Sequence, residues 1–181
     1  YSIGYMRCNN EHEQTGYFAA FAICMSSVMG IAMASNLLTF FFFYELLTIA
    51  SYPLVLHKRN EEALLASRKY LIYTLISGQL FLAGLVAVYC ISGTMDFKAG
   101  GFLTTDMAPT WQLQLIFLIM ILAGSVKAAV MPLHGWLPAA MIAPTPVSAL
   151  LHAVAVVKTG VFAVLRIIGF VSVSYTHLTL P

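Results

Sequence analysis

Residues 123–146 read AGSVKAAVMPLHGWLPAAMIAPTP and combine two features that are unfavourable inside an apolar helix. One is a single lysine, Lys127, in an otherwise uncharged run. The other is a set of four prolines between residues 132 and 146. An interior proline removes a backbone hydrogen bond and clashes with the preceding turn. The stretch therefore predicts a helix that is broken near Pro132, with Gly135 and Pro138 in the irregular part.

The composition places this stretch in a membrane protein. Hydrophobic residues make up 60% of the 181 residues and charged residues only 9%, whereas soluble domains are about half apolar and about a quarter charged. A backbone irregularity at membrane depth is tolerated only where protein or water covers it. The three cysteines show no metal-ligand spacing, so neither a disulfide nor a bound metal is expected. The net charge of +2 is too small to indicate a nucleic-acid partner.

Apolar runs of about 20 residues, the length that crosses a bilayer, divide the chain. They predict an all-α protein with five transmembrane helices, of which the fourth is discontinuous. A polar loop is expected over residues 1–15, and a second long loop over 92–110. The expected spans are 16–34, 37–56, 71–91, 111–142 with its break, and 146–170.

The distribution of Lys and Arg predicts the orientation. Five such residues lie on the side that holds the first loop and the turn between the second and third spans: Arg7, Lys58, Arg59, Arg68 and Lys69. Only Lys98 and Arg166 lie on the other side. The positive-inside rule therefore places the N-terminal loop in the cytoplasm. Arg68 and Lys69 are interpreted as interfacial anchors.

The last residues of the chain are excluded from the fold prediction. The segment VSYTHL, Val173 to Leu178, resembles the translation of a transposon-end adapter used in sequencing libraries. Residues 173–181 are therefore expected to be a remnant of that adapter.

Ionisable residues occur near the middle of three expected spans. They are Glu45 in the second, Lys127 in the fourth and Lys158 in the fifth, which also contains His152. A charge at the centre of a lone helix costs about 2.5–3.5 kcal/mol on insertion scales, so such residues face a bundle interior and mark a pathway or a pair.

Two interpretations of these charges remain open. Low hydration favours a neutral amine and a nearby carboxylate favours an ammonium, so movement of Glu45 could switch Lys127 between holding and releasing a proton. His152 and Lys158 could carry the proton onward; on a regular helix they lie about 9 Å and about 120° apart, so a bridging group is needed. The alternative is a static Glu–Lys pair in a structural anchor subunit. His152 could equally be a structural histidine, and His134 is interpreted as part of the helix break.

A third class, a membrane enzyme, has no support, because no metal-ligand spacing, nucleophile motif or nucleotide-binding loop is present. No cofactor or redox site is expected in this chain, and any redox chemistry would lie in partner subunits.

Three segments resemble the antiporter-like membrane subunits shared by respiratory complex I, Mrp-type cation/proton antiporters and membrane-bound hydrogenase complexes. They are YSIGYM from Tyr1, FYELL around Glu45, and KAAVMPLHGWLPAAMIAPTPVSALLHAVAVVKTGVF from Lys127 to Phe162. The resemblance implies that Glu45 matches a carboxylate on the family's fifth helix, Lys127 a lysine on its discontinuous seventh, and Lys158 and His152 the eighth-helix position.

The resemblance also implies function and partners. The family's core is two inverted five-helix repeats, and this chain is similar to the first. Proton or cation/proton translocation is implied, within a complex of several membrane subunits such as an NADH:quinone oxidoreductase, in a bacterial or archaeal cell membrane. Two departures leave the complex unassigned. LLHAVAVVKTG contains both the histidine and the lysine, and PLHGWLPAAM lacks the acidic residue that many members have after WLP.

Overall fold

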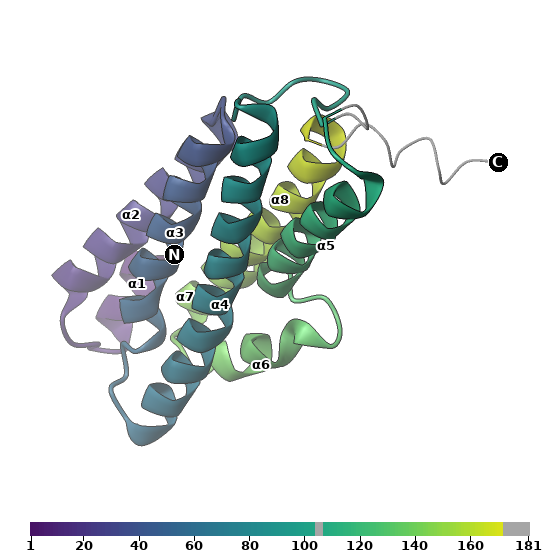
Figure 1. Cartoon of the computed structure of the whole chain (residues 1–181). Helices are drawn as coiled ribbons and strands as arrows, with labels where there is room; N and C mark the ends of the chain where they lie inside the picture. Colours follow the sequence, from purple (N-terminus) through teal and green to yellow (C-terminus); the bar gives the residue numbers. More distant parts are fainter. Residues whose placement is uncertain (104–106, 172–181) are drawn as a thin grey trace.

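The structure is a computed structural model that describes residues 1–103 and 107–171 (Figure 1). Within these residues every regular element is helical, apart from one isolated bridge between Asn36 and Asp96. The helices are α1 Ser2–Cys8, α2 Gln14–Met33, α3 Leu37–Val55, α4 Glu61–Ser92, α5 Thr110–Lys127, α6 Trp136–Ala140, α7 Thr145–Ala149 and α8 Val156–Phe170. A 3₁₀ turn, Leu133–Gly135, precedes α6, and a π turn, Leu150–Val154, joins α7 to α8.

Five of these segments are long and apolar enough to cross a membrane. They are α2, α3, α4, α5 and the unit from Thr145 to Phe170. The predicted all-α architecture with five spans, the fourth of them discontinuous, is therefore confirmed, and the chain is an integral membrane protein. The expected remnant at residues 173–181 lies outside the described residues.

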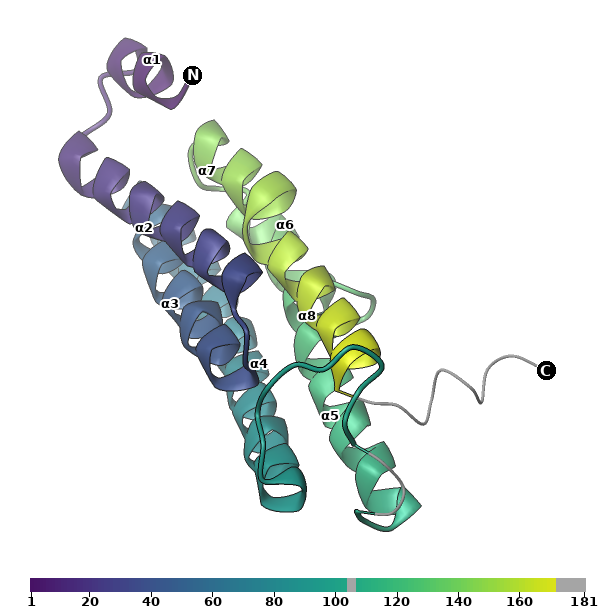
Figure 2. The ribbon, with the colours of Figure 1, turned by 90° about the horizontal axis from the view of Figure 1, so that it is seen from above.

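The spans form a bundle in which helices that follow each other along the chain pack together. Helix α2 packs against α3, α3 against α4, α4 against α5, and α5 against α8. Figure 1 shows α6 lying beside the lower part of α4, away from the upper half of the bundle that α5 occupies. Seen from above, α2 and α3 lie on one side of the bundle, and α5 and α8 lie on the other (Figure 2). The discontinuous span thus leaves the bundle axis after α5, and α8 returns along it.

Side-chain caps and a glycine define the ends of the long helices. Asn36 and Asn60 cap α3 and α4, because their side-chain oxygens accept hydrogen bonds from the backbone N–H groups of Thr39 and Ala63. Helix α4 ends at Gly93, whose φ of 66° is favoured by glycine. Asn36 therefore marks the turn between α2 and α3, and Asn60 marks the turn between α3 and α4 at the opposite end of the bundle.

Two boundaries differ from those expected. Residues 1–15 are not one loop: helix α1 forms within them and buries Met6, and α2 already begins at Gln14. Helix α4 begins at Glu61 rather than near residue 71, since Asn60 caps it and two glutamates in its first turn favour the positive end of the helix dipole. Its 32 residues span about 48 Å, more than the roughly 30 Å hydrocarbon core. The first turns of α4 therefore extend beyond the hydrocarbon.

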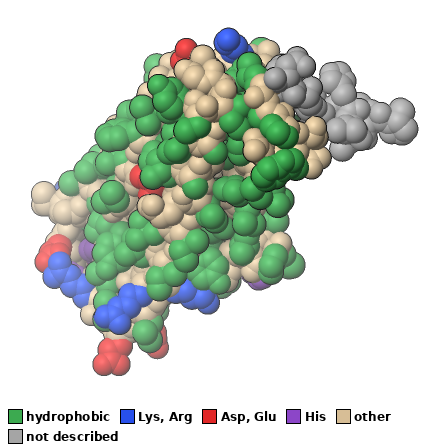
Figure 3. All heavy atoms as spheres, viewed as in Figure 1, with side chains coloured by type: hydrophobic (Ala, Val, Ile, Leu, Met, Phe, Trp, Pro, Cys, Tyr) green, Lys and Arg blue, Asp and Glu red, His purple; other side chains and the backbone are tan. Residues whose placement is uncertain are grey.

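The surface matches a lipid environment. Large apolar side chains are exposed on several spans, among them Met33, Ile49, Leu65 and Leu118. In Figure 3 apolar atoms cover most of the visible face, and Lys and Arg side chains gather toward the end at which α4 begins.

Candidate functional site

The break in the fourth span begins at the lysine itself. Helix α5 ends with Lys127, and the next residues turn away, with Ala129 at a φ of 55°. Pro132 then precedes the 3₁₀ turn, Gly135 ends it, and Pro138 lies inside α6. The discontinuity expected near Pro132 is present, and α5 already ends at Lys127, before that proline. Lys127 thereby lies at a helix C-terminus, where the helix dipole favours a positive charge.

Carbonyl groups near the end of α5 accept hydrogen bonds from the break itself and from the neighbouring helices α4 and α6. The indole nitrogen of Trp136 donates to the Val126 carbonyl at 2.8 Å, and the backbone N–H of Val130 donates to the Ser125 carbonyl at 3.1 Å. The Ser77 hydroxyl donates to the Ala123 carbonyl at 2.8 Å. The break is thus stabilised by tertiary hydrogen bonds, as a helix end inside a protein requires.

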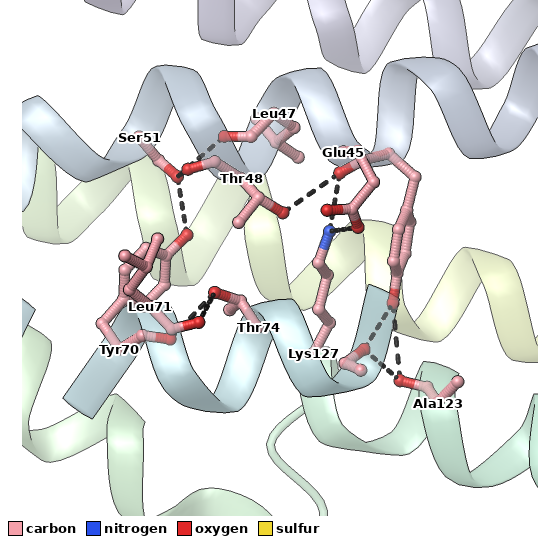
Figure 4. Close-up of polar contacts among 11 residues, drawn as sticks. Glu45, Leu47, Thr48, Ser51, Tyr70, Leu71, Thr74, Ala123 and Lys127 are labelled. Carbon is pink, nitrogen blue, oxygen red and sulfur yellow. Dashed lines mark hydrogen bonds and ion pairs between the residues drawn. The ribbon is translucent and has the colours of Figure 1, made fainter. Parts of the chain in front are cut away.

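Three contacts hold the fully buried Lys127 side chain. Its Nζ donates a hydrogen bond of 2.6 Å to the backbone carbonyl of Tyr44 and lies 3.3 Å from the centroid of the Tyr44 ring. It also lies 3.7 Å from Oε1 of Glu45, which makes an ion pair (Figure 4). The two charges that the sequence placed near the middle of the second and fourth expected spans therefore meet in the fold.

Glu45 occupies a position between this lysine and the outer surface of the bundle. Its side chain is 18% exposed and lines an apolar groove of about 560 Å³ on α3, together with residues such as Phe42 and Ile49. Its buried Oε1 has no hydrogen-bond partner among the described residues. On the inner side, a Cβ at Gly78 of α4 would overlap the Glu45 carboxylate. Gly78 thus provides the space into which the carboxylate fits.

Small polar groups continue from the ion pair along α3 and α4. The Thr48 hydroxyl donates to the same Tyr44 carbonyl at 3.3 Å, and Ser51 shares a 2.6 Å hydrogen bond with the Tyr70 hydroxyl. Figure 4 shows these groups in one row with Lys127. We call Thr48, Ser51, Tyr70 and Thr74 the polar row. Sequence reasoning missed it; the signal was the helical spacing of Thr48 with Ser51 and of Tyr70 with Thr74.

The polar row approaches the helix break at its far end. The Tyr70 ring packs against the Trp136 ring with centroids 5.4 Å apart. The Nζ of Lys69 lies 3.6 Å from where a Cβ on Gly135 would stand. Lys69, interpreted from sequence as an interfacial anchor, therefore reaches the break.

The structure does not bring Lys158 or His152 into contact with Lys127. Lys158 is exposed and lines an apolar groove of about 330 Å³ between α2 and α8. His152 lies in the π turn, and its buried Nε2 has no hydrogen-bond partner among the described residues. The expected 120° separation assumed a regular α-helix. The π turn, where the N–H of Ala155 bonds to the Leu150 carbonyl, changes that relation.

The histidine of the break has a similar environment. Nδ1 of His134 is buried and has no hydrogen-bond partner within residues 1–103 and 107–171. Its position in the 3₁₀ turn agrees with the expected place in the helix break.

Comparison with known proteins places this site in a family context. Residues 34–180 match the family described as NADH:quinone oxidoreductase/Mrp antiporter, TM. Na(+)/H(+) antiporter subunit A1 of Staphylococcus epidermidis is 30% identical over 176 residues, which cover 96% of this chain and 22% of the relative. NAD(P)H-quinone oxidoreductase subunit 5, organellar chromatophore 1, of Paulinella chromatophora is 31% identical over 173 residues, covering 92% of this chain and 26% of the relative.

Solved structures agree with these matches. A chain of the membrane-bound sulfane sulfur reductase, an archaeal respiratory membrane complex, superimposes with a TM-score of 0.75 at 30% identity. The match covers 82% of this chain and 30% of that one. The chain thus spans between a fifth and a third of the length of the relatives it matches.

Proposed function

The chain belongs to the NADH:quinone oxidoreductase/Mrp antiporter transmembrane family, and from that premise we propose that it translocates protons, or protons in exchange for a cation, as part of a multi-subunit membrane complex. The names of its relatives, a Na(+)/H(+) antiporter subunit and a quinone oxidoreductase subunit, support this activity. A structural neighbour from a respiratory membrane complex supports partners that are themselves membrane subunits.

The observation that carries the proposal is the buried pair at the helix break. Lys127 is fully buried at the end of α5 and lies 3.7 Å from Glu45. Burial favours the neutral amine, and the Glu45 carboxylate favours the ammonium. Glu45 also borders the open groove on α3, so rotation of its side chain toward that groove would weaken the pair. Lys127 would then release its proton, which makes the pair a switch.

The polar row indicates from which end of the bundle protons reach Lys127. Tyr70 lies toward the end of the bundle where α4 begins and where Lys and Arg gather (Figure 3). Hydroxyl groups both donate and accept hydrogen bonds, so Tyr70 and Ser51 can pass a proton between them. The Thr48 hydroxyl lies further along the row, on the Tyr44 carbonyl that Lys127 contacts, and the steps from Ser51 to Thr48 and on to Lys127 require bridging water. In this scheme protons approach Lys127 from the end with the excess of positive residues.

The onward step of the proposed relay uses Lys158 or His152. Both residues belong to the last span, in which α8 packs against α5. Because neither contacts Lys127 among the described residues, the transfer requires a bridging water or side chain.

Replacing Lys127 in the full-length parent subunit tests the proposal. We expect Lys127→Ala to abolish proton uptake by vesicles that contain the assembled complex, because the proton-holding group is lost. Lys98→Ala is the matched control, since Lys98 is exposed in the loop after α4, and it should leave uptake unchanged.

The same experiment distinguishes the alternative, a structural anchor with a static Glu–Lys pair. The short contact between Lys127 and the Tyr44 carbonyl favours a fixed lysine. An assembled Lys127→Ala complex with uptake at the parent level would support the anchor and refute the switch.

A further inference from the structure

A second cluster of ionisable side chains lies outside the bundle core, where the segment between α1 and α2 meets the end of α3. It consists of Glu11, His12 and His57, and the ligand atoms of all three lie within 4.8 Å of one another. Oε2 of Glu11 lies 3.8 Å from Nε2 of His57. The rings of His12 and His57 stack with centroids 4.8 Å apart. Three potential ligands from two distant chain segments therefore converge on one place.

The burial of His57 distinguishes this cluster from an ordinary group of charged residues on a protein surface. Its side chain is 6% exposed, yet its Nε2 has no hydrogen-bond partner within the described part of the chain. A buried polar atom without a partner loses its hydration and gains nothing in return. Nε2 is also the His57 atom that faces Glu11.

We infer that Glu11, His12 and His57 form a binding site for a borderline divalent transition metal ion of the Zn²⁺ type. Two imidazoles and one carboxylate are a ligand set that zinc uses, with water in the fourth position. Mg²⁺ and Ca²⁺ are disfavoured, because they prefer sites made of oxygen ligands. The expectation of no metal rested on cysteine spacing and did not consider this histidine pair.

The geometry needs only local adjustment to hold an ion. Ligand atoms on a tetrahedral zinc with bonds of about 2.0–2.1 Å are about 3.3 Å apart, compared with the 3.8 Å between Glu11 and His57. His12 is exposed, so its ring is free to rotate out of the stack and direct a nitrogen at the same point. His57, held by burial, is the fixed ligand around which the other two close.

The surrounding contacts already hold the two segments together. Arg59 donates a 2.6 Å hydrogen bond to Oε2 of Glu13, and the Tyr17 ring packs edge-on against His57 at 5.3 Å. A bound ion would add a second link between the segment before α2 and the turn after α3. This site is separate from the Glu45–Lys127 pair and does not depend on the proposed transport function.

Metal titration of the full chain in detergent tests the inference. We expect calorimetry to show one Zn²⁺ bound per chain, with Mg²⁺ giving no saturable binding. His57→Ala, His12→Ala and Glu11→Gln should each weaken zinc binding by about tenfold or more, the scale at which even supporting residues affect metal affinity. Co²⁺ should give the visible absorption of tetrahedral coordination, and His57→Ala should remove it.

Two further variants control the zinc titration: one at a histidine outside the proposed site, and one at the exposed ligand His12. His134→Ala, which removes a histidine at the helix break, should leave zinc affinity unchanged. If His57→Ala fails to fold, the result for His12→Ala decides, because that side chain is exposed. Absence of stoichiometric zinc binding to the unmodified chain, or equal affinity in His12→Ala and the unmodified chain, would overturn the inference.

Discussion

At the scale of single residues, Lys127 shows how a charge is held inside a membrane protein. The ammonium contacts a carbonyl, an aromatic ring and a carboxylate, all supplied by Tyr44 and Glu45 of α3. Removing one partner of such a pair leaves an uncompensated buried charge, whereas replacing both with apolar groups of similar size can be nearly neutral. A variant that replaces both residues can therefore lose the proposed proton-carrying pair and still fold stably.

We predict that Glu45→Leu lowers the free energy of unfolding by about 3 kcal/mol or more, because Lys127 loses its counter-charge. The double variant Glu45→Leu with Lys127→Met should recover most of that loss. Denaturant unfolding in detergent measures both. A double variant that is as unstable as the single one would contradict the pairing.

The double variant also separates the two functional interpretations in the full-length subunit. A switch predicts an assembled complex without proton uptake, and a static anchor predicts an assembled complex with normal uptake.

At the scale of elements, α8 packs closely against the break in the fourth span. A Cβ at Gly160 would overlap the backbone N of Ala128 and approach the carbonyl carbon of Lys127 to 2.6 Å. Backbone atoms cannot rotate away as a flexible side chain can. Gly160 therefore sets the distance between α8 and the end of α5, and with it the position of Lys127.

We predict that Gly160→Ala destabilises the chain by about 1–3 kcal/mol, the usual cost of overpacking a core. Gly169→Ala is the matched control on the same helix, because nothing lies within 4 Å of its added Cβ. It should be neutral or stabilise by up to about 1 kcal/mol, since alanine favours helix more than glycine does. Thermal unfolding in detergent compares the two; equal effects would show that α8 does not pack closely at the break.

At the scale of the whole molecule, the charges at the two ends of the bundle predict its orientation. The end at which α4 begins carries the turn with Lys58 and Arg59 and the first turns of α4 with Arg68 and Lys69. Lys98 lies in the loop at the opposite end. The positive-inside rule therefore predicts that the first of these ends faces the cytoplasm.

We predict that a cysteine at Glu62 is protected from an impermeant thiol reagent in intact cells, and that a cysteine at Ala99 is labelled. Both positions are exposed; Glu62 lies in the first turn of α4, and Ala99 lies in the loop that follows the other end of this helix. The native Cys8, Cys24 and Cys90 are first replaced. Replacing Glu62 leaves every Lys and Arg in place, so the predicted bias is retained. Labelling at position 62 and protection at position 99 would show that the orientation is the opposite of the predicted one.

The sequence by itself determined the spans, the break and the candidate charges. Hydropathy and proline chemistry are properties of short segments, so the five spans and a break near Pro132 could be predicted locally, whereas the end of α5 at Lys127 could not. Glu45 and Lys127 could be selected because a charge in an apolar run is conspicuous without knowledge of its neighbours.

Only the tertiary structure decided which of these residues meet. It paired Glu45 with Lys127, left Lys158 on an outer groove and brought His57 to Glu11 across two chain segments. It also formed the π turn around His152, where an α-helix was expected. The physical reason is that a contact between distant segments depends on helix rotation and on close approaches such as that at Gly160, which arise from packing of the whole bundle and not from the local pattern.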